Sequence, residues 1–260
     1  MSIFSKINKP DDMEESKDVI FKGGKEPLPT GLYPATVEMA ILKESSGGAI
    51  GVELHLDIDG RDFREDIYLT NRNGDTFYTR EKDGQDVNYP LPGYTTTNDL
   101  AIITTGYSIE DQETEVKTVE LWDKEAEDKI PKEVDMLEDI RGKKIIVGIF
   151  LDNDFSQKNV GDASNPKWVD DFSKEFKRNS INKIFNEDGF TAGELINELE
   201  EPSFVEEWRE SYTAEYVNDK TVAKKRKAEK AAKSGKKPGA AAKPGLGGNK
   251  PKTSMFSKKK

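Results

Sequence analysis

The sequence has no cysteine, only one histidine, His55, and no apolar run that reaches about 18 residues, the length needed to cross a membrane. Without thiols the chain forms no disulfide, thiolate nucleophile or thiolate zinc site. Without a long apolar run it offers no membrane-spanning helix, and its first residues lack the apolar core of a signal peptide. These absences predict a soluble intracellular protein that makes no contact with a membrane.

Charged residues, in contrast, are abundant and unevenly distributed. The 260 residues include 40 Lys and Arg and 50 Asp and Glu, a net charge of −10. Residues 220–260 hold 15 of the basic residues and one acid, so this tail carries +14 and the rest of the chain −24. A basic tail is drawn to polyanions or acidic protein surfaces, whereas an acidic body binds nucleic acid only through a local patch.

Three strands joined by short turns are predicted in the first part of the chain. Apolar and polar residues alternate over 33–41, 52–58 and 63–69, as in half-buried strands. Asp59-Gly60 is a tight hairpin signal between the second and third strands. The three strands therefore form an antiparallel meander. His55 falls on the polar side of the middle strand, where we expect a surface or rim residue rather than a catalytic base.

The remaining chain predicts a helix, more strands and two C-terminal helices. Residues 71–93 are typical of a long polar loop, either functional or disordered. The expected helix covers 95–105, with a threonine cap and Gly106 as its end. Strands are expected over 116–122, 134–137, 145–151 and within 172–185, with a loop over 152–167. Capping boxes at Thr191/Glu194 and Ser203/Glu206 predict helices through 199 and about 217.

This order of elements predicts a mainly β, α+β fold: an OB-like antiparallel β-barrel with an inserted helix, C-terminal helices and a disordered basic tail. A different small barrel or a sandwich would give a similar pattern. We expect a flexible arm over 1–27, the barrel over 28–190, a helical segment over 191–219 and a largely disordered tail over 220–260. Within that tail, the Ala- and Lys-rich residues 220–233 are expected to form a helix on binding.

No arrangement of catalytic or metal-binding residues emerges from the sequence. Asp152-Asn153-Asp154 begins like a calcium loop but lacks the glycine and glutamate that follow in one. Gly47-Gly48 joins two strands and does not open a helix, as a phosphate-binding loop would. We therefore expect no catalytic residue, no metal and no cofactor. An enzyme with a carboxylate metal site, such as a nuclease, is one rival hypothesis.

The positive signal is a stretch in which aromatic and basic residues interleave. Single-stranded nucleic acid is held without sequence preference when bases stack on rings and cations follow the backbone. The candidate residues for DNA binding are Arg64, Tyr68, Arg72, Phe77, Tyr78, Arg80, Lys82 and Tyr94, with Arg61 and Tyr89 in the same stretch. Tyr68 and Arg64 share a face opposite the apolar residues, so Tyr68 is the ring presented to a ligand. The stretch also contains acids and is not net basic, so an ordinary solvated β surface explains it equally well.

Several short segments resemble a known family when they are taken in order. They are Leu28-Pro29-Thr30-Gly31-Leu32-Tyr33 and the residues at 45–49, 57–61, 68–71, 91–94 and 100–106. Together they resemble the single-stranded DNA-binding proteins of bacteriophages, in particular of podoviruses that carry a virion RNA polymerase. The resemblance covers about 28–217. It implies a role in phage DNA replication and recombination in the host cell cytoplasm, and a link to late transcription through host RNA polymerase.

The basic C-terminal tail departs from the acidic tail with which many single-strand binders recruit partners. Met255 and Phe256, next to Lys258, Lys259 and Lys260, predict a contact with a protein partner. By the resemblance, that partner is host RNA polymerase or a phage replication protein. Extra phosphate contacts with DNA are the alternative use of the tail. A second rival for the whole chain is an acidic structural or adaptor protein, tethered by its tail, that does not bind single strands.

Overall fold

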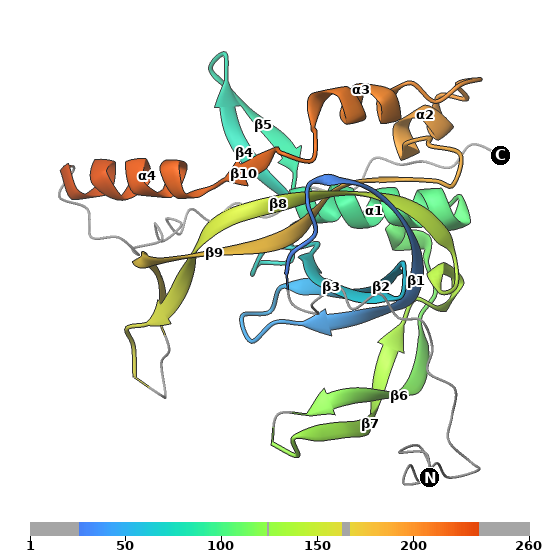
Figure 1. The fold of residues 1–260 in the computed structure, drawn as a ribbon, viewed down its shortest axis with the longest axis horizontal. Helices are drawn as coiled ribbons and strands as arrows, with labels where there is room; N and C mark the ends of the chain where they lie inside the picture. Colours follow the sequence, from blue (N-terminus) through green and yellow to red (C-terminus); the bar gives the residue numbers. More distant parts are fainter. Residues whose placement is uncertain (1–25, 124, 163–166, 234–260) are drawn as a thin grey trace, which may run out of the picture. The chain divides into compact units, whose positions relative to one another are not determined.

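The computed structural model describes residues 26–123, 125–162 and 167–233 (Figure 1). The chain divides into two compact units. Unit 1 consists of residues 1–151 and 179–216, and unit 2 of residues 152–178 and 217–260. The fold is mainly β with antiparallel strand pairs, as the alternating sequence predicts.

The predicted meander forms the centre of unit 1. It consists of β1 (Gly31–Glu44), β2 (Ile50–Ile58) and β3 (Arg61–Tyr68), paired antiparallel in sequence order. The turn between β2 and β3 places Asp59 and Gly60 at φ 54° and 73°, the left-handed pair that a two-residue hairpin requires. A bulge between Val37 and Met39 interrupts the pairing of β1 with β2.

Further elements of unit 1 follow the meander. Their bounds are β4 (Phe77–Lys82), β5 (Gln85–Pro90), α1 (Pro92–Thr105), η2 (Ile109–Asp111), β6 (Glu115–Asp123), β7 (Asp128–Met136), η3 (Glu138–Ile140), α2 (Ala192–Ile196) and α3 (Phe204–Ser211). The long strands β8 (Lys144–Asn159) and β9 (Trp168–Phe185) each contribute one part to unit 1. Strand β8 pairs antiparallel with β1, from Gly31↔Ile149 to Thr36↔Lys144, and β9 pairs with β8. Among the described strands no β3–β9 pairing closes a barrel, so the OB-like barrel stays a prediction.

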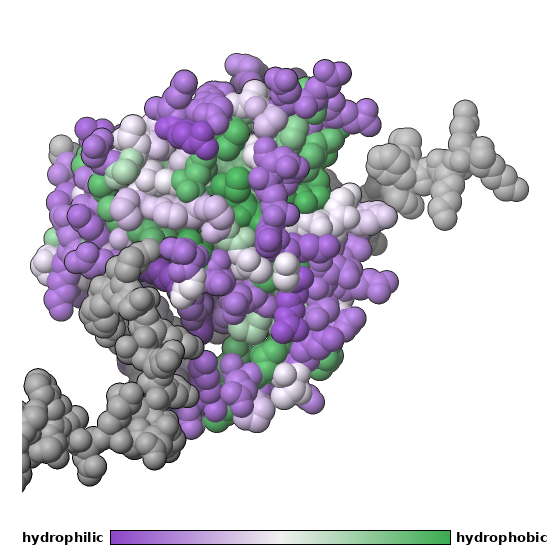
Figure 2. Space-filling view, turned by 45° about the vertical axis from the view of Figure 1, so that its right-hand side comes forward, coloured by the Kyte–Doolittle hydropathy of each residue, from purple (hydrophilic) through white to green (hydrophobic). Residues whose placement is uncertain are grey.

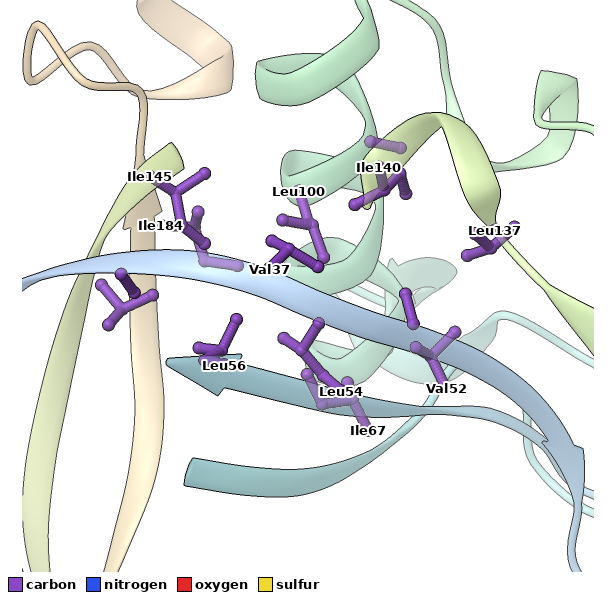
Figure 3. Close-up of a cluster of buried hydrophobic side chains, with 14 of the residues drawn as sticks. Val37, Val52, Leu54, Leu56, Ile67, Leu100, Leu137, Ile140, Ile145 and Ile184 are labelled. Atoms are coloured by element: carbon purple, nitrogen blue, oxygen red, sulfur yellow. The ribbon is translucent and has the colours of Figure 1, made fainter. Parts of the chain in front are cut away.

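The main core of unit 1 lies between the meander and α1. Figure 3 shows side chains of β1, β2 and β3 pointing toward one another and toward Leu100 of α1. Ile145 from β8 and Ile184 from β9 complete the same cluster. Helix α1 begins at Pro92, after Leu91, rather than at the predicted threonine cap; its predicted end at Gly106 is confirmed at φ 83°. Proline suits this first helical position because its missing N–H would have no partner there.

The two C-terminal helices of unit 1 are tied together by one glutamate. Thr191 and Glu194 form the predicted capping box of α2. The second predicted box is wrong, because Ser203 makes no side-chain cap on α3 and its hydroxyl instead donates to Glu194 at 2.9 Å. Trp208 of α3 is 2% exposed and packs against Phe150.

Unit 2 contains the second part of β8, the first part of β9, β10 (Val217–Asp219) and α4 (Thr221–Lys233). The predicted loop over 152–167 is wrong, because β8 continues to Asn159. The buried carboxylates of Asp152 and Asp154 are compatible with this strand because Lys220 and Lys224 neutralise them. The first part of the predicted tail is therefore a helix whose lysines bind the sheet of unit 2. Residues 1–25 of the predicted arm and 234–260 of the tail lie outside the described residues.

Candidate nucleic-acid interface

The segment predicted as a polar loop over 71–93 contains a regular β-hairpin, β4–β5, so that prediction is wrong. The strands pair from Phe77↔Pro90 to Lys82↔Gln85 around a two-residue turn, Asp83-Gly84. This turn places both residues at positive φ, 55° and 77°. The hairpin projects from the body of unit 1 in Figure 1 and forms a two-stranded sheet of its own. Tyr78, Val87 and Tyr89 are half-buried on one face, the other residues are exposed, and none belongs to a hydrophobic core cluster, so the hairpin has little hydrophobic alternation.

One face of the hairpin combines aromatic rings with a cation. Side chains alternate between the two faces of a strand, so Tyr78 and Arg80 share a face with the cross-strand partner of Tyr78, Tyr89. The rings of Tyr78 and Tyr89 stack at 5.7 Å between centroids and 22° between planes. The guanidinium of Arg80 lies 4.8 Å from the centre of the Tyr78 ring. Lys82 extends the same face toward the tip of the hairpin.

The opposite face of the hairpin is acidic. Glu81 and Asp86 are direct cross-strand partners, and both lie on the side away from Tyr78. Phe77, 39% exposed, is on this face too. Acidic and basic residues are mixed along the sequence, but the hairpin places Glu81 and Asp86 on one face. The opposite face, which carries Tyr78 and Arg80, therefore consists mainly of aromatic rings and cations.

A second exposed ring lies on the outer face of the meander. Tyr68 ends β3, is 40% exposed and has the ammonium of Lys43 5.9 Å from its ring centre. The ring rests on Gly51, because a Cβ added there would lie 2.9 Å from a ring carbon of Tyr68. The backbone carbonyl of Tyr68 packs still more closely on Gly93 at the start of α1, where an added Cβ would lie 2.1 Å from the oxygen. Two glycines therefore fix the position of this ring.

The predicted phosphate-binding cations differ in how free they are. Arg64 forms a salt bridge with Asp62 at 2.8 Å, and this hydrogen bond raises the pKa of Arg64 and lowers that of Asp62. Arg64 is therefore partly neutralised before any ligand binds. The side chain of Arg72 passes over the β1–β2 turn, with its Nε 3.2 Å from the position of a Cβ on Gly47.

Two residues that the sequence analysis singled out, Tyr94 and His55, are held by contacts within the protein. The hydroxyl of Tyr94 donates to Glu110 at 2.6 Å, and this bond, with partial burial, raises the pKa of Tyr94 to about 12. Its ring packs against the main core, so Tyr94 is not presented like Tyr68. The expectation of a surface or rim position for His55 is wrong: this residue is 2% exposed and its Nε2 lies 2.8 Å from Glu53. Its cross-strand neighbours on the same face are Met39 and Arg64.

No other kind of site appears in the described part of the chain. Within residues 26–123, 125–162 and 167–233, no group of three or more His, Cys, Asp or Glu is placed to hold a metal ion. In the same ranges no helix is long and apolar enough to cross a membrane. The predicted partner residues Met255, Phe256, Lys258, Lys259 and Lys260 lie outside the described residues.

Comparison with known proteins finds no family model, no curated protein and no solved structure that matches this chain. A functional assignment therefore depends on the chemistry of the surface. Figure 2 shows one face of the protein, on which hydrophilic side chains predominate and hydrophobic ones gather in patches between them.

Proposed function

We propose that the protein binds single-stranded DNA through the Tyr78–Arg80 face of the β4–β5 hairpin and through Tyr68 on the meander. The observation that carries this proposal is the sorting of side chains by the hairpin. Two stacked rings and a guanidinium share one face, while Glu81 and Asp86 share the other. Stacked rings offer flat surfaces to bases of any sequence, and a cation beside them meets the phosphates.

The element order supports an OB-like arrangement for unit 1. A three-strand meander is followed by α1 and then by β8 and β9, with β8 paired to β1. The backbone N–H of Ile181 in β9 also donates to the Glu65 side chain of β3 at 2.7 Å. OB-folds bind oligonucleotides on the face of their second and third strands and at adjoining loops. Tyr68 and Arg64 lie on the corresponding face here.

The resemblance of the sequence to phage single-strand binders extends the proposal to a biological role. The protein then covers single strands during phage DNA replication and recombination in the host cytoplasm. The basic tail recruits a protein partner, either a replication protein or the host RNA polymerase in late transcription. Neither role requires catalysis, a metal or a cofactor.

Titration of labelled oligo-dT with the full chain tests the DNA-binding role. Tyr78→Ala removes one stacking ring and should weaken binding by about 1–3 kcal/mol, roughly 5- to 150-fold. Tyr78→Phe keeps the ring and should bind like the wild type. Thr79→Ala changes the neighbouring residue on the opposite face and serves as the matched control.

Two results would refute the proposal. One is the absence of binding by the folded wild-type protein at low salt, which together with capture of a protein partner would favour the adaptor hypothesis. The other is equal affinity of the Tyr78→Ala and Thr79→Ala proteins. Divalent-metal-dependent cleavage of the oligonucleotide would instead favour a nuclease.

A further inference from the structure

The first part of β9, in unit 2, presents a row of exposed aromatic rings outside the proposed interface. Trp168, Phe172 and Phe176 are four residues apart on one strand. Because side chains alternate along a strand, all three share a face, with successive rings roughly 13 Å apart. Their exposed fractions are 61%, 46% and 40%. Exposed apolar patches mark surfaces that meet another molecule, and a row of three rings on one strand is a candidate for such a surface.

Contacts within unit 2 hold two of these rings, Phe172 and Phe176. Phe172 meets the buried ring of Phe155 edge to face at 5.0 Å. The guanidinium of Arg178 lies 5.9 Å from the centre of the Phe176 ring. Lys174, which is exposed, lies between Phe172 and Phe176 in the same alternation. On this face the rings are separated by Asp170, which Lys224 pairs, and by the cation Lys174, and Arg178 follows Phe176.

The acids of this region are largely neutralised from within unit 2. Lys224 of α4 binds Asp154 at 2.7 Å and Asp170 at 2.9 Å. Arg178 lies 3.3 Å from Asp154, while Lys220 holds Asp152. Lys220, Lys224 and Arg178 are thus already paired with carboxylates of unit 2.

Three other cations of α4 are not paired with carboxylates in this way. Arg226, Lys227 and Lys230 are exposed and form no ion pair with any acid in the described parts of the chain. Counted over its whole sequence, unit 2 carries 20 basic and 8 acidic residues, a net charge of +12, of which +8 belongs to residues 234–260 outside the described part. Unit 1 carries −22, so the charge of unit 2 favours a polyanion and that of unit 1 opposes one.

From these observations we infer that unit 2 carries a second surface for single-stranded DNA, separate from the β4–β5 hairpin. Bases stack on Trp168, Phe172 and Phe176, and phosphates meet Lys174 and the exposed cations of α4. A duplex hides the faces of its bases, so rings of this kind select a single strand. This second surface binds the same class of ligand as the interface under the proposed function, but it shares no residue with that interface. Either proposal can therefore be refuted without refuting the other.

Tryptophan fluorescence provides a local signal for this surface. The chain has three tryptophans: Trp208 is buried, while Trp122 and Trp168 are exposed. In a full-length Trp122→Phe protein, Trp168 is the exposed tryptophan, and stacking against a base should quench its emission. The probe is oligo-dT of about 8 nucleotides, within the range that one OB-fold covers. We expect saturable quenching at low salt, which weakens as salt is added.

Substitutions in this background test the inference. Phe172→Ala should move the midpoint of quenching to a roughly 5- to 150-fold higher DNA concentration. In the otherwise wild-type chain, Trp168→Ala should weaken binding measured by anisotropy, whereas Trp122→Ala, which removes a similarly exposed tryptophan from β6, should not.

The possible outcomes separate the two proposals. Quenching that is shifted by Phe172→Ala but not by Tyr78→Ala supports the second surface, whatever the hairpin does. Anisotropy that depends on Tyr78 without any change in Trp168 emission overturns the second surface and leaves the proposed function intact. Absence of both signals, from a protein with wild-type circular dichroism, refutes both proposals.

Discussion

Replacing Glu194 by glutamine tests how the start of α3 is held to α2. The carboxylate is 7% exposed and accepts hydrogen bonds from the backbone N–H groups of Thr191, Ser203 and Phe204 at 2.8–2.9 Å. The hydroxyls of Thr191 and Ser203 add two further bonds. Burial alone would raise the pKa of Glu194, but these donors outweigh it and lower the pKa from 4.5 to about 2.

The pKa gives the size and the sign of the expected effect. A lowering from 4.5 to about 2 corresponds to roughly 3 kcal/mol, of which glutamine, with one acceptor oxygen left, should lose roughly 2 kcal/mol. Because the folded-state pKa is the lower one, this stabilisation is fully present above pH 4.5 and is lost as pH falls toward 2. Glutamine offers one acceptor oxygen and turns an NH₂ group toward backbone donors, so it loses this contribution.

Thermal unfolding measured across pH checks the expectation. Near neutral pH, Glu194→Gln should lower Tm by roughly 4–8 °C, since 1 kcal/mol shifts Tm by about 2–4 °C in chains of similar size. The difference should shrink as pH falls below 4.5. Glu210→Gln, at an exposed position of α3, is the control and should leave Tm unchanged. Equal Tm values for Glu194→Gln and the wild type near neutral pH would refute the reasoning.

Two further predictions concern the two surfaces. Gly51→Ala introduces a Cβ 2.9 Å from the Tyr68 ring and should displace that ring; oligo-dT affinity should fall by up to about the 1–3 kcal/mol of one stacked base, and an unchanged affinity would remove Tyr68 from the interface. In unit 2, burial raises the pKa of Asp154, but Lys224, the Phe155 N–H and a nearby guanidinium outweigh it, so the net pKa is lowered. Asp154→Asn should therefore increase proteolysis of α4 near neutral pH, with a difference from wild type that diminishes under acid conditions; equal cleavage throughout would show that this ion pair does not hold the helix.

Hydrophobic alternation in the sequence predicts the three strands of the meander and their buried face correctly. Val52, Leu54 and Leu56 are fully buried, as their spacing predicts. The same rule failed for His55, because alternation assigns a residue to a face and does not reveal what covers that face. The side chain of Glu53 pairs with His55 on that face, and Met39 and Arg64 are the cross-strand partners of His55.

The β4–β5 hairpin was missed because neither of its faces is buried in the core. Its apolar period is limited to Val87 and Tyr89 of β5, which is too short to predict a strand, so the turn chemistry of Asp83-Gly84 is its clearest signal. The extension of β8 was missed for a different reason. Asp152 and Asp154 interrupt its apolar run, and the lysines that neutralise them lie far away in the sequence.

Under the two proposals, the difference in charge between the two units gives their surfaces different roles in binding. In unit 1, at −22, repulsion opposes the approach of any nucleic acid, so the proposed binding there depends on stacking at Tyr78 and Tyr89. Such a contact requires exposed bases, and the acidic body weakens unspecific attachment to duplex. Unit 2, at +12, supplies attraction without requiring a particular base. Salt should therefore weaken binding mainly through unit 2, and Arg80→Ala should lower the salt slope by no more than about 0.7, the value of one phosphate contact on a single strand.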